Sequence, residues 1–238
     1  MDGFDDFMMT TVPTTARPLL GTTFLLVEDS RFAAEGFRLL CLRSGGRIRR
    51  ADSLTSARKH LKVYRPNVVL VDMTLPDGSG AELIRDLDQQ TARPDAIIAV
   101  SGDDTMEQAA LQAGADRFLL KPLRRLAEFQ AAILQLLPKE KRPVGPRAIV
   151  DSEVEPDAMA YRDDLFHAAD SIDHVASRED LAYVSQFLSG VAESAGDRTL
   201  ADAARTLPDD VPSAAEASAA LGNLSKMVKL RINASDAF

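Results

Sequence analysis

The sequence predicts an α/β domain with a doubly wound, five-stranded parallel sheet, followed by a small all-α helical bundle. Between Thr22 and Leu137, short apolar runs alternate with longer segments of helical period, which is typical of repeated β-α units. Most of the apolar runs are continuous, as in strands that are buried on both faces. After Val150 the period is helical only, in a stretch rich in Ala, Leu, Asp and Ser.

Each expected element starts or stops at Ser, Asp, Gly or Pro. The expected strands are Thr23–Val27, Arg47–Arg50, Val68–Val71, Ala96–Val100 and Arg117–Leu120. The helices of the α/β part are expected near Ser30–Ser44, Ser53–Tyr64, Gly80–Gln90, Thr105–Ala113 and Leu123–Leu137. Further helices are expected near Pro156–Ala176, Arg178–Ala195, Arg198–Thr206 and Pro212–Ile232. A turn is predicted at Leu75–Gly80, where Gly78 and Gly80 permit positive φ.

Composition sets the expected domain boundaries. Residues 1–19 are acidic and lack a long apolar stretch, so we expect a flexible tail and not a secretory signal. The α/β domain is expected at residues 20–138. The segment Pro138–Val150 holds three prolines and no period, which predicts a linker at residues 139–152. The helical domain then occupies residues 153–238.

Charge and cysteine content restrict the class of protein. The net charge is −8, and residues 151–238 alone carry 7 Lys and Arg against 17 Asp and Glu. This acidic part repels phosphate backbones, which counts against nucleic-acid binding by it without excluding such binding. The chain lacks an apolar run of bilayer length, and we expect no membrane insertion. The single cysteine, Cys41, fits the reducing cytoplasm.

Unusual polar residues follow four of the expected strands. Glu28 and Asp29 follow the first, Asp72 the third, Ser101 the fourth and Lys121 the fifth. The carboxyl ends of strands in an open parallel sheet gather at one crevice, where such folds bind ligands. We therefore expect three carboxylates, a hydroxyl and an ammonium group around one point.

This cluster suits phosphoryl transfer to Asp72. Carboxylates about 4 Å apart repel by roughly 4 kcal/mol per pair at an effective dielectric constant near 20, so three of them need compensation. Mg²⁺ accepts such oxygen ligands, and Lys121 adds a further positive charge. A phosphoryl group on Asp72 could then contact Mg²⁺, Lys121 and the hydroxyl of Ser101. Taken singly, Asp29 or Ser101 is as simply explained as a helix cap.

The motifs at these strand ends resemble those of the receiver domains of two-component response regulators. The matching segments are Phe24–Ser30, Val69–Gly80, Ala99–Gly102 and Phe118–Pro122. The resemblance covers about residues 20–138 and implies a flavodoxin-like, CheY-like fold. It implies that Asp72 accepts phosphate from the phosphohistidine of a histidine kinase or a histidine phosphotransfer protein. It also implies that Ser101 hydrogen-bonds the phosphoryl group while Phe118 turns inward, although Phe118 could equally be a core aromatic residue.

The same resemblance implies the metal ligands and the limits of the activity. Asp29, Asp72 and the carbonyl group of Thr74 are expected to bind Mg²⁺, with Glu28 helping through water. No other cofactor is expected. The domain is expected to catalyse only its own phosphoryl transfer and dephosphorylation, and not to act as an enzyme on other substrates. Its output is expected to be altered affinity for a downstream protein partner.

Two interpretations of the helical part remain open. The segments Tyr183–Ala192 and Gly196–Leu207 resemble the central hairpin of a histidine phosphotransfer domain. Gln186 stands where that family has its histidine, and an amide cannot relay a phosphoryl group, so the domain would be a pseudo-phosphotransfer bundle. The alternative is an unrelated Ala-rich bundle. His167 and His174 lack the phosphotransfer motif and are interpreted as surface residues.

Two other outputs remain open from the sequence. A pattern typical of a helix-turn-helix is found in the segments Leu200–Leu207 and Pro212–Leu221. It would make the protein a DNA-binding transcriptional regulator. The second helix, however, offers Ala, Ser and Glu where Arg, Asn or Gln read bases. A phosphorelay intermediate that serves as a phosphate sink is the remaining alternative.

Overall fold

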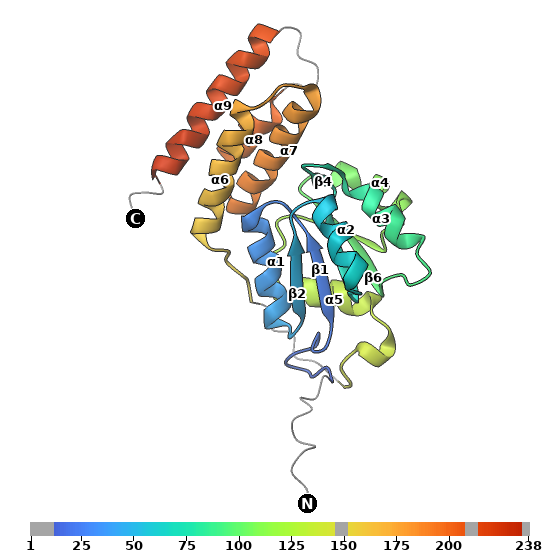
Figure 1. Cartoon of the computed structure of the whole chain (residues 1–238). Helices are drawn as coiled ribbons and strands as arrows, with labels where there is room; N and C mark the ends of the chain where they lie inside the picture. The colour runs from blue at the N-terminus through green and yellow to red at the C-terminus, as the bar shows by residue number, and fades with distance from the viewer. Residues whose placement is uncertain (1–11, 146–151, 208–213, 235–238) are drawn as a thin grey trace, which may run out of the picture.

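The computed structural model describes residues 12–145, 152–207 and 214–234. An α/β domain comes first and an all-helical region follows it (Figure 1). Five parallel strands form the sheet of the α/β domain, in the order β2-β1-β3-β6-β7. Strands β1 and β3 are therefore neighbours, which brings the acidic residues at their ends together. The predicted fold class is confirmed.

The strands closely follow the predicted ones. They are β1 (Thr23–Val27), β2 (Arg47–Ala51), β3 (Val68–Asp72), β6 (Ala96–Ser101) and β7 (Arg117–Leu120). Three of them end one residue later than predicted, because Ala51, Asp72 and Ser101 still pair with a residue of the neighbouring strand. A short antiparallel hairpin that was not predicted follows β3, and it consists of β4 (Thr74–Leu75) and β5 (Gly78–Ser79).

Helices cover both faces of the sheet. They are α1 (Arg31–Arg43), α2 (Leu54–Val63), α3 (Gly80–Asp88), α4 (Glu107–Gln112) and α5 (Leu126–Leu136), with 3-10 turns at Asp104–Met106 and Lys139–Lys141. Ser30, Ser53 and Ser79 precede the first three helices, and each hydroxyl accepts a hydrogen bond from a backbone N–H of the first turn. Such caps satisfy N–H groups that lack a partner within the helix. They fix where each helix begins after its loop.

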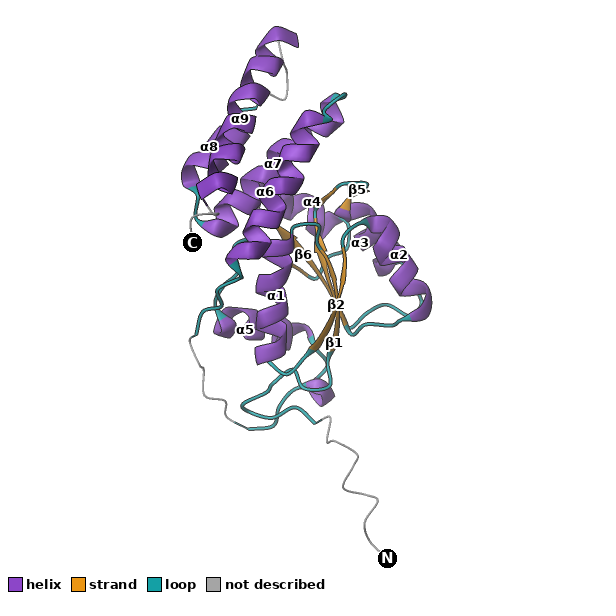
Figure 2. Ribbon diagram, turned by 60° about the vertical axis from the view of Figure 1, so that its left-hand side comes forward, coloured by secondary structure: helices purple, strands orange, loops and turns teal. Residues whose placement is uncertain are grey.

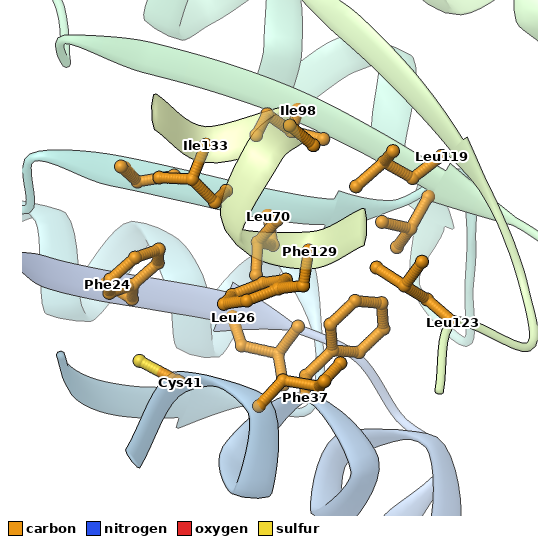
Figure 3. Close-up of a cluster of buried hydrophobic side chains, with 14 of the residues drawn as sticks. Phe24, Leu26, Phe37, Cys41, Leu70, Ile98, Leu119, Leu123, Phe129 and Ile133 are labelled. Carbon is orange, nitrogen blue, oxygen red and sulfur yellow. The ribbon is translucent and has the colours of Figure 1, made fainter. Parts of the chain in front are cut away.

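The sheet separates two hydrophobic cores, because alternate residues of a strand point to opposite faces. Leu26 packs with Phe37 of α1 and Phe129 of α5 (Figure 3). On the other face, Val27 packs with side chains of α2, α3 and α4. Figure 2 shows the sheet between these two layers of helices. Burying one large apolar side chain contributes about 1.5–3 kcal/mol, so a register shift that exposed them is strongly disfavoured.

The helical region has a core of its own. Its helices are α6 (Ala158–Asp173), α7 (Arg178–Ala195), α8 (Arg198–Arg205) and α9 (Ala214–Ala234). Ser177 and Asp180 form a capping box at the start of α7, and Gly196 ends that helix with φ 80°. Buried side chains from all four helices meet in one cluster, which includes Leu165, Leu188, Leu200, Leu224 and Val228.

The helical region lies against the α/β domain at the carboxyl ends of the strands (Figure 1). Helix α6 contacts α1, and α7 contacts both α1 and β4. The segment that leads into α6 also packs on the α/β domain, because Val154 is buried in the core beside α1 and α5. Within the described residues, the two parts are therefore packed on each other.

Both ends of the α/β domain differ from the predicted boundaries in detail. Pro18 and Leu19, which the sequence places in the tail, are buried, and Leu19 joins the core beside α1. The expected tail otherwise falls largely on residues 1–11, and much of the expected linker on residues 146–151; both lie outside the described residues. Among the helices that the structure describes, none has the length and apolar character needed to span a bilayer.

Candidate functional site

Three carboxylates lie together where β1 and β3 end. Glu28 and Asp29 directly follow β1, and Asp72 is the last residue of β3. One oxygen atom of each group lies within 4.8 Å of the others. Glu28 and Asp72 are almost completely buried, with 0% and 5% of their surface exposed. The parallel pairing of β1 with β3 therefore produces the predicted acidic cluster.

Lys121 supplies the positive charge of the cluster. It directly follows β7, and its Nζ lies 2.7 Å from Oδ2 of Asp72 and 3.1 Å from Oε2 of Glu28. Burial by itself lowers the pKa of the Lys121 ammonium group, but the charges of Asp72 and Glu28 outweigh burial and raise this pKa. Lys121 is therefore charged at neutral pH and holds Asp72 by a direct ion pair.

One ammonium group does not balance three carboxylates. Burial raises the pKa of Glu28 well above its usual value. Burial, followed by the charge of Asp72, raises the pKa of Asp29 to about 7. Clustered oxygen donors with excess negative charge fit a hard divalent cation such as Mg²⁺. The donor set at Glu28, Asp29 and Asp72 thus suits the ion that the sequence predicts.

Ser101 and Thr74 lie beside the carboxylates. Ser101 ends β6, is buried, and its Oγ accepts a hydrogen bond of 3.1 Å from the backbone N–H of Asp103. The backbone N–H of Thr74 donates to Oδ1 of Asp72 at 3.2 Å. These residues line one cavity of about 560 Å³ together with Asp72 and Lys121. The structure thus brings together six of the seven predicted site residues.

The seventh predicted site residue, Phe118, lies on β7 and outside this cavity. Its side chain is half-buried and packs against the core formed with α2, α3 and α4. Leu61 and Met106 are the other half-buried side chains at this core. An inward movement of Phe118 therefore stays a prediction.

Gly80 is required by a close approach to the backbone of Asp72 and not by positive φ. Gly78 has φ 142°, as predicted, but Gly80 is not among the positive-φ residues. A Cβ atom at position 80 would lie only 2.0 Å from the carbonyl oxygen of Asp72. Helix α3 starts at this glycine, so the first turn of α3 packs directly against the backbone of Asp72.

The helical region contributes residues to this site that the sequence did not assign to it. Oη of Tyr183 donates a hydrogen bond of 2.7 Å to Oδ2 of Asp29. Oγ1 of Thr74 donates to Oε1 of Gln186 at 2.9 Å. Gln186, the residue at the histidine position of the resembled phosphotransfer motif, lines the same cavity as Asp72.

One signal in the sequence could have identified a further residue, Asp164. It falls on the apolar stripe of α6 with Leu165 and Ala168, and it is 2% exposed. A carboxylate on a buried stripe needs hydrogen-bond donors from another element.

His167 contacts Oη of Tyr183 at 3.2 Å and does not line the cavity.

Comparisons with known proteins agree with this geometry. The model of the response regulator receiver domain matches residues 24–133. KdpE, the KDP operon transcriptional regulatory protein of Escherichia coli strain K12, is 32% identical over 140 residues, which are 58% of this chain and 62% of KdpE. The transcriptional regulatory protein CitB of Klebsiella pneumoniae is 43% identical over 75 residues, 31% of this chain and 32% of CitB. The chain thus spans less than two thirds of either relative.

Solved structures are also similar to part of the chain. The response regulator receiver domain (CheY-like) from Methylobacillus flagellatus has 27% sequence identity and a TM-score of 0.44. The likeness covers 48% of this chain and 98% of that one.

Proposed function

We propose that residues 24–133, which match the model of the response regulator receiver domain, act as such a domain and that Asp72 accepts a phosphoryl group from a phosphohistidine. The donor is a histidine kinase or a histidine phosphotransfer protein. The observation that carries the proposal is the contact of 2.7 Å between Asp72 and the Lys121 ammonium group, inside a cluster of two further carboxylates.

The proposed reaction moves one phosphoryl group. An Oδ atom of Asp72 forms a bond to phosphorus while the nitrogen–phosphorus bond of the donor histidine breaks and its electron pair returns to the imidazole. Lys121 and the hydroxyl of Ser101 are placed to bind the phosphoryl oxygens. Mg²⁺, when bound, neutralises charge on these oxygens. Asp29, Asp72 and the carbonyl group of Thr74 would hold the ion, with Glu28 acting through water.

The proposed output is altered affinity for a downstream protein partner. Phosphorylation adds about −1.5 to −2 charge units at a buried site. This added charge shifts the receiver domain between two conformations, and we place the change at the face of α4 and β7. The receiver domain catalyses its own phosphoryl transfer and dephosphorylation only. A cytoplasmic location is part of the proposal, and the single cysteine, Cys41, supports it.

We further propose that the helical region is a pseudo-phosphotransfer bundle, which binds partners without chemistry. Its support is the position of Gln186, which stands at the histidine of the resembled motif and lines the cavity of Asp72. An amide has no nucleophilic nitrogen that can carry a phosphoryl group, so a relay through position 186 is excluded.

The phosphoacceptor is tested by incubation with acetyl phosphate and Mg²⁺, followed by intact mass measurement. The wild-type chain should gain one phosphoryl group, and Asp72→Asn should gain none. Asp86→Asn, at an exposed ion pair with Arg58, is the matched control and should react like wild type. Equal modification of Asp72→Asn would overturn the proposal.

DNA binding is the second candidate, because KdpE and CitB are transcriptional regulators. In this chain the two helices of the expected helix-turn-helix, α8 and α9, bury Leu200, Ala204, Leu224 and Val228 in the bundle core, and residues 151–238 are strongly acidic. Sequence-specific, salt-sensitive retardation of DNA on a native gel would favour this candidate.

A phosphate sink, the third option, predicts that deletion of residues 151–238 leaves signalling intact.

A further inference from the structure

The helical region covers the proposed phosphorylation site. Three side chains from α6 and α7 contact the segments that directly follow β1 and β3, and these side chains are Asp164, Tyr183 and Gln186. Figures 1 and 2 both place α6 and α7 at the carboxyl ends of the strands. Any change at the phosphorylation site therefore acts directly on this contact.

Hydrogen bonds of Asp164 join α6 to the start of α1. Its Oδ2 accepts hydrogen bonds from Oγ of Ser30 at 2.7 Å and from the backbone N–H of Phe32 at 2.9 Å. Its Oδ1 accepts from the backbone N–H of Arg31 at 2.8 Å. The first N–H groups of a helix lack partners within it, and a carboxylate at this end also interacts favourably with the helix dipole. A buried acid of the helical region thus caps a helix of the receiver domain.

Tyr183 hydrogen-bonds a carboxylate that the proposed cation would bind. Its Oη donates to Oδ2 of Asp29 at 2.7 Å, and Asp29 is one of the three acidic residues whose oxygens converge. A cation and a hydroxyl proton are both attracted to the lone pairs of this carboxylate. Coordination of Mg²⁺ by Asp29 therefore opposes the contact with Tyr183.

Helix α7 also approaches the loop where a phosphoryl group would extend from Asp72. A Cβ atom at Gly102, next to Ser101, would lie 3.4 Å from Oε2 of Glu193 and 3.6 Å from Cα of Gly190. Glu193 is paired with Arg205, yet it remains a carboxylate at the cavity of Asp72. Arg205 lines the same cavity, so an added phosphoryl charge would repel Glu193, attract Arg205 and thereby disturb their ion pair.

From these contacts, and resting on the proposed function, we propose that the helical region is an intramolecular inhibitor that competes with Mg²⁺ and the phosphoryl group for the receiver site. Docking through Asp164, Tyr183 and Gln186 holds the receiver in its unphosphorylated form. Phosphorylation of Asp72 releases α6 and α7. Because coupling between two binding equilibria is reciprocal, weakening the docking contacts strengthens binding at Asp72.

The first experiment measures the affinity of the full chain for Mg²⁺ by titration calorimetry, with all variants in the same buffer at the same pH. Tyr183→Phe should bind Mg²⁺ at least about fivefold more tightly than wild type, which is the lower end of typical coupling. Tyr161→Phe is the matched control because Tyr161 contacts Asp197 and not the receiver carboxylates. Its affinity should equal that of wild type. Equal or weaker binding by Tyr183→Phe would overturn the proposal.

The second experiment follows amide hydrogen exchange at the start of α1, where Arg31 and Phe32 donate to Asp164. Beryllofluoride with Mg²⁺ mimics phosphorylation and should speed exchange of these two amides in wild type, but not in Asp72→Asn. In Asp164→Ala exchange should be fast from the start. Asp170→Ala, on the exposed part of α6, should behave like wild type.

The two experiments separate the two proposals. If acetyl phosphate modifies Asp72 but beryllofluoride leaves the exchange of Arg31 and Phe32 unchanged, the inhibitor proposal is wrong and the phosphoacceptor stands. If neither wild type nor Asp164→Ala is modified at Asp72, the proposed function itself is wrong.

Discussion

The charge balance around Lys121 dominates the chemistry at the scale of single residues. One buried ammonium group faces Asp72 and Glu28 directly, while Asp29 completes the acidic cluster without an ion pair to it among the described contacts. Asp29 instead accepts a hydrogen bond from Oη of Tyr183. The residue with the weakest charge compensation is therefore also the one that the helical region contacts.

This arrangement predicts that stability falls as pH rises when no divalent cation is present. Burial chiefly, and the charge of Asp72 next, raise the pKa of Asp29 from 3.8 to about 7. Between these values the folded chain keeps a proton that the unfolded chain has lost, so ionisation of Asp29 costs folding free energy. We expect the free energy of unfolding to decrease by on the order of 2 kcal/mol between about pH 4 and 7.

Urea unfolding at a series of pH values measures this decrease. Asp29→Asn cannot ionise, so its curve should be flatter over the same range. Saturating Mg²⁺ should also flatten the wild-type curve, because the cation compensates the ionised carboxylate. If the curve of Asp29→Asn followed that of wild type, Asp29 would not be the responsible group.

A second residue-scale prediction concerns Gly80. Gly80→Ala would place a Cβ atom 2.0 Å from the carbonyl oxygen of Asp72, so either α3 or the end of β3 must move. Overpacking of this kind costs typically about 1–3 kcal/mol, and we expect a loss of at least about 2 kcal/mol in thermal or urea unfolding. Phosphorylation of Asp72 by acetyl phosphate should also slow.

Gly222→Ala is the control for this substitution. Gly222 lies within α9, and beyond its chain neighbours and the adjacent backbone of that helix no atom would come within 4 Å of its new Cβ. Alanine in a helix interior is favoured over glycine by roughly 0.5–1 kcal/mol, so this variant should be slightly more stable than wild type. Equal effects of the two substitutions would contradict the steric explanation.

The sequence predicts the site residues of the receiver domain because their signals are local. Glu28, Asp72, Ser101 and Lys121 each stand directly at a strand end, and the parallel order of strands brings such ends together. Tyr183 and Gln186 carry no such signal. They reach the site through packing of α7 on the receiver, across more than a hundred residues of chain, and periodicity within one helix does not predict that orientation.

At the scale of elements, hydrophobic patterns predict where strands lie but not where they end. Asp72 and Ser101 belong to β3 and β6 since each still has a partner in the neighbouring strand, although their side chains are polar. The functional consequence is direct. Asp72, the proposed phosphoacceptor, is held by backbone pairing within the sheet and not by a loose loop, which fixes its distance to Lys121.

The helices of the helical region depend on Asp197, which links three of them. Its Oδ1 accepts from the backbone N–H of Leu200 at the start of α8 and from Nη2 of Arg231 on α9. Oη of Tyr161 on α6 lies 3.4 Å from Oδ2. The hydrogen bond from Arg231 is the main cause that lowers the pKa of Asp197, so the carboxylate is ionised at neutral pH.

Asp197→Ala should therefore loosen the helical region. Loss of a helix cap alone costs about 0.5–2 kcal/mol, and we expect a loss in the upper half of that range because the pair with Arg231 is lost as well. Faster amide exchange in α8 and α9 measures the effect. Asp202→Ala, which removes an exposed carboxylate of α8, should change exchange little, and an equal change in both variants would argue against the linking role.

At the scale of the whole molecule, the receiver domain and the helical region meet at the residue that is proposed to be modified. The buried hydrogen bonds of Asp164 and the contact of Tyr183 with Asp29 connect the helical region to the acidic cluster. The proposed inhibition needs no long-range pathway, because the same few contacts would respond to the cation and to the phosphoryl group.

The proposed switch depends most directly on the identity of the modified residue. After incubation with acetyl phosphate and Mg²⁺, borohydride reduces an aspartyl phosphate to homoserine, and peptide mass spectrometry locates that homoserine. We predict homoserine at position 72 and nowhere else in the chain. Homoserine at another aspartate, or a modified chain in which Asp72 remains intact, would contradict the account.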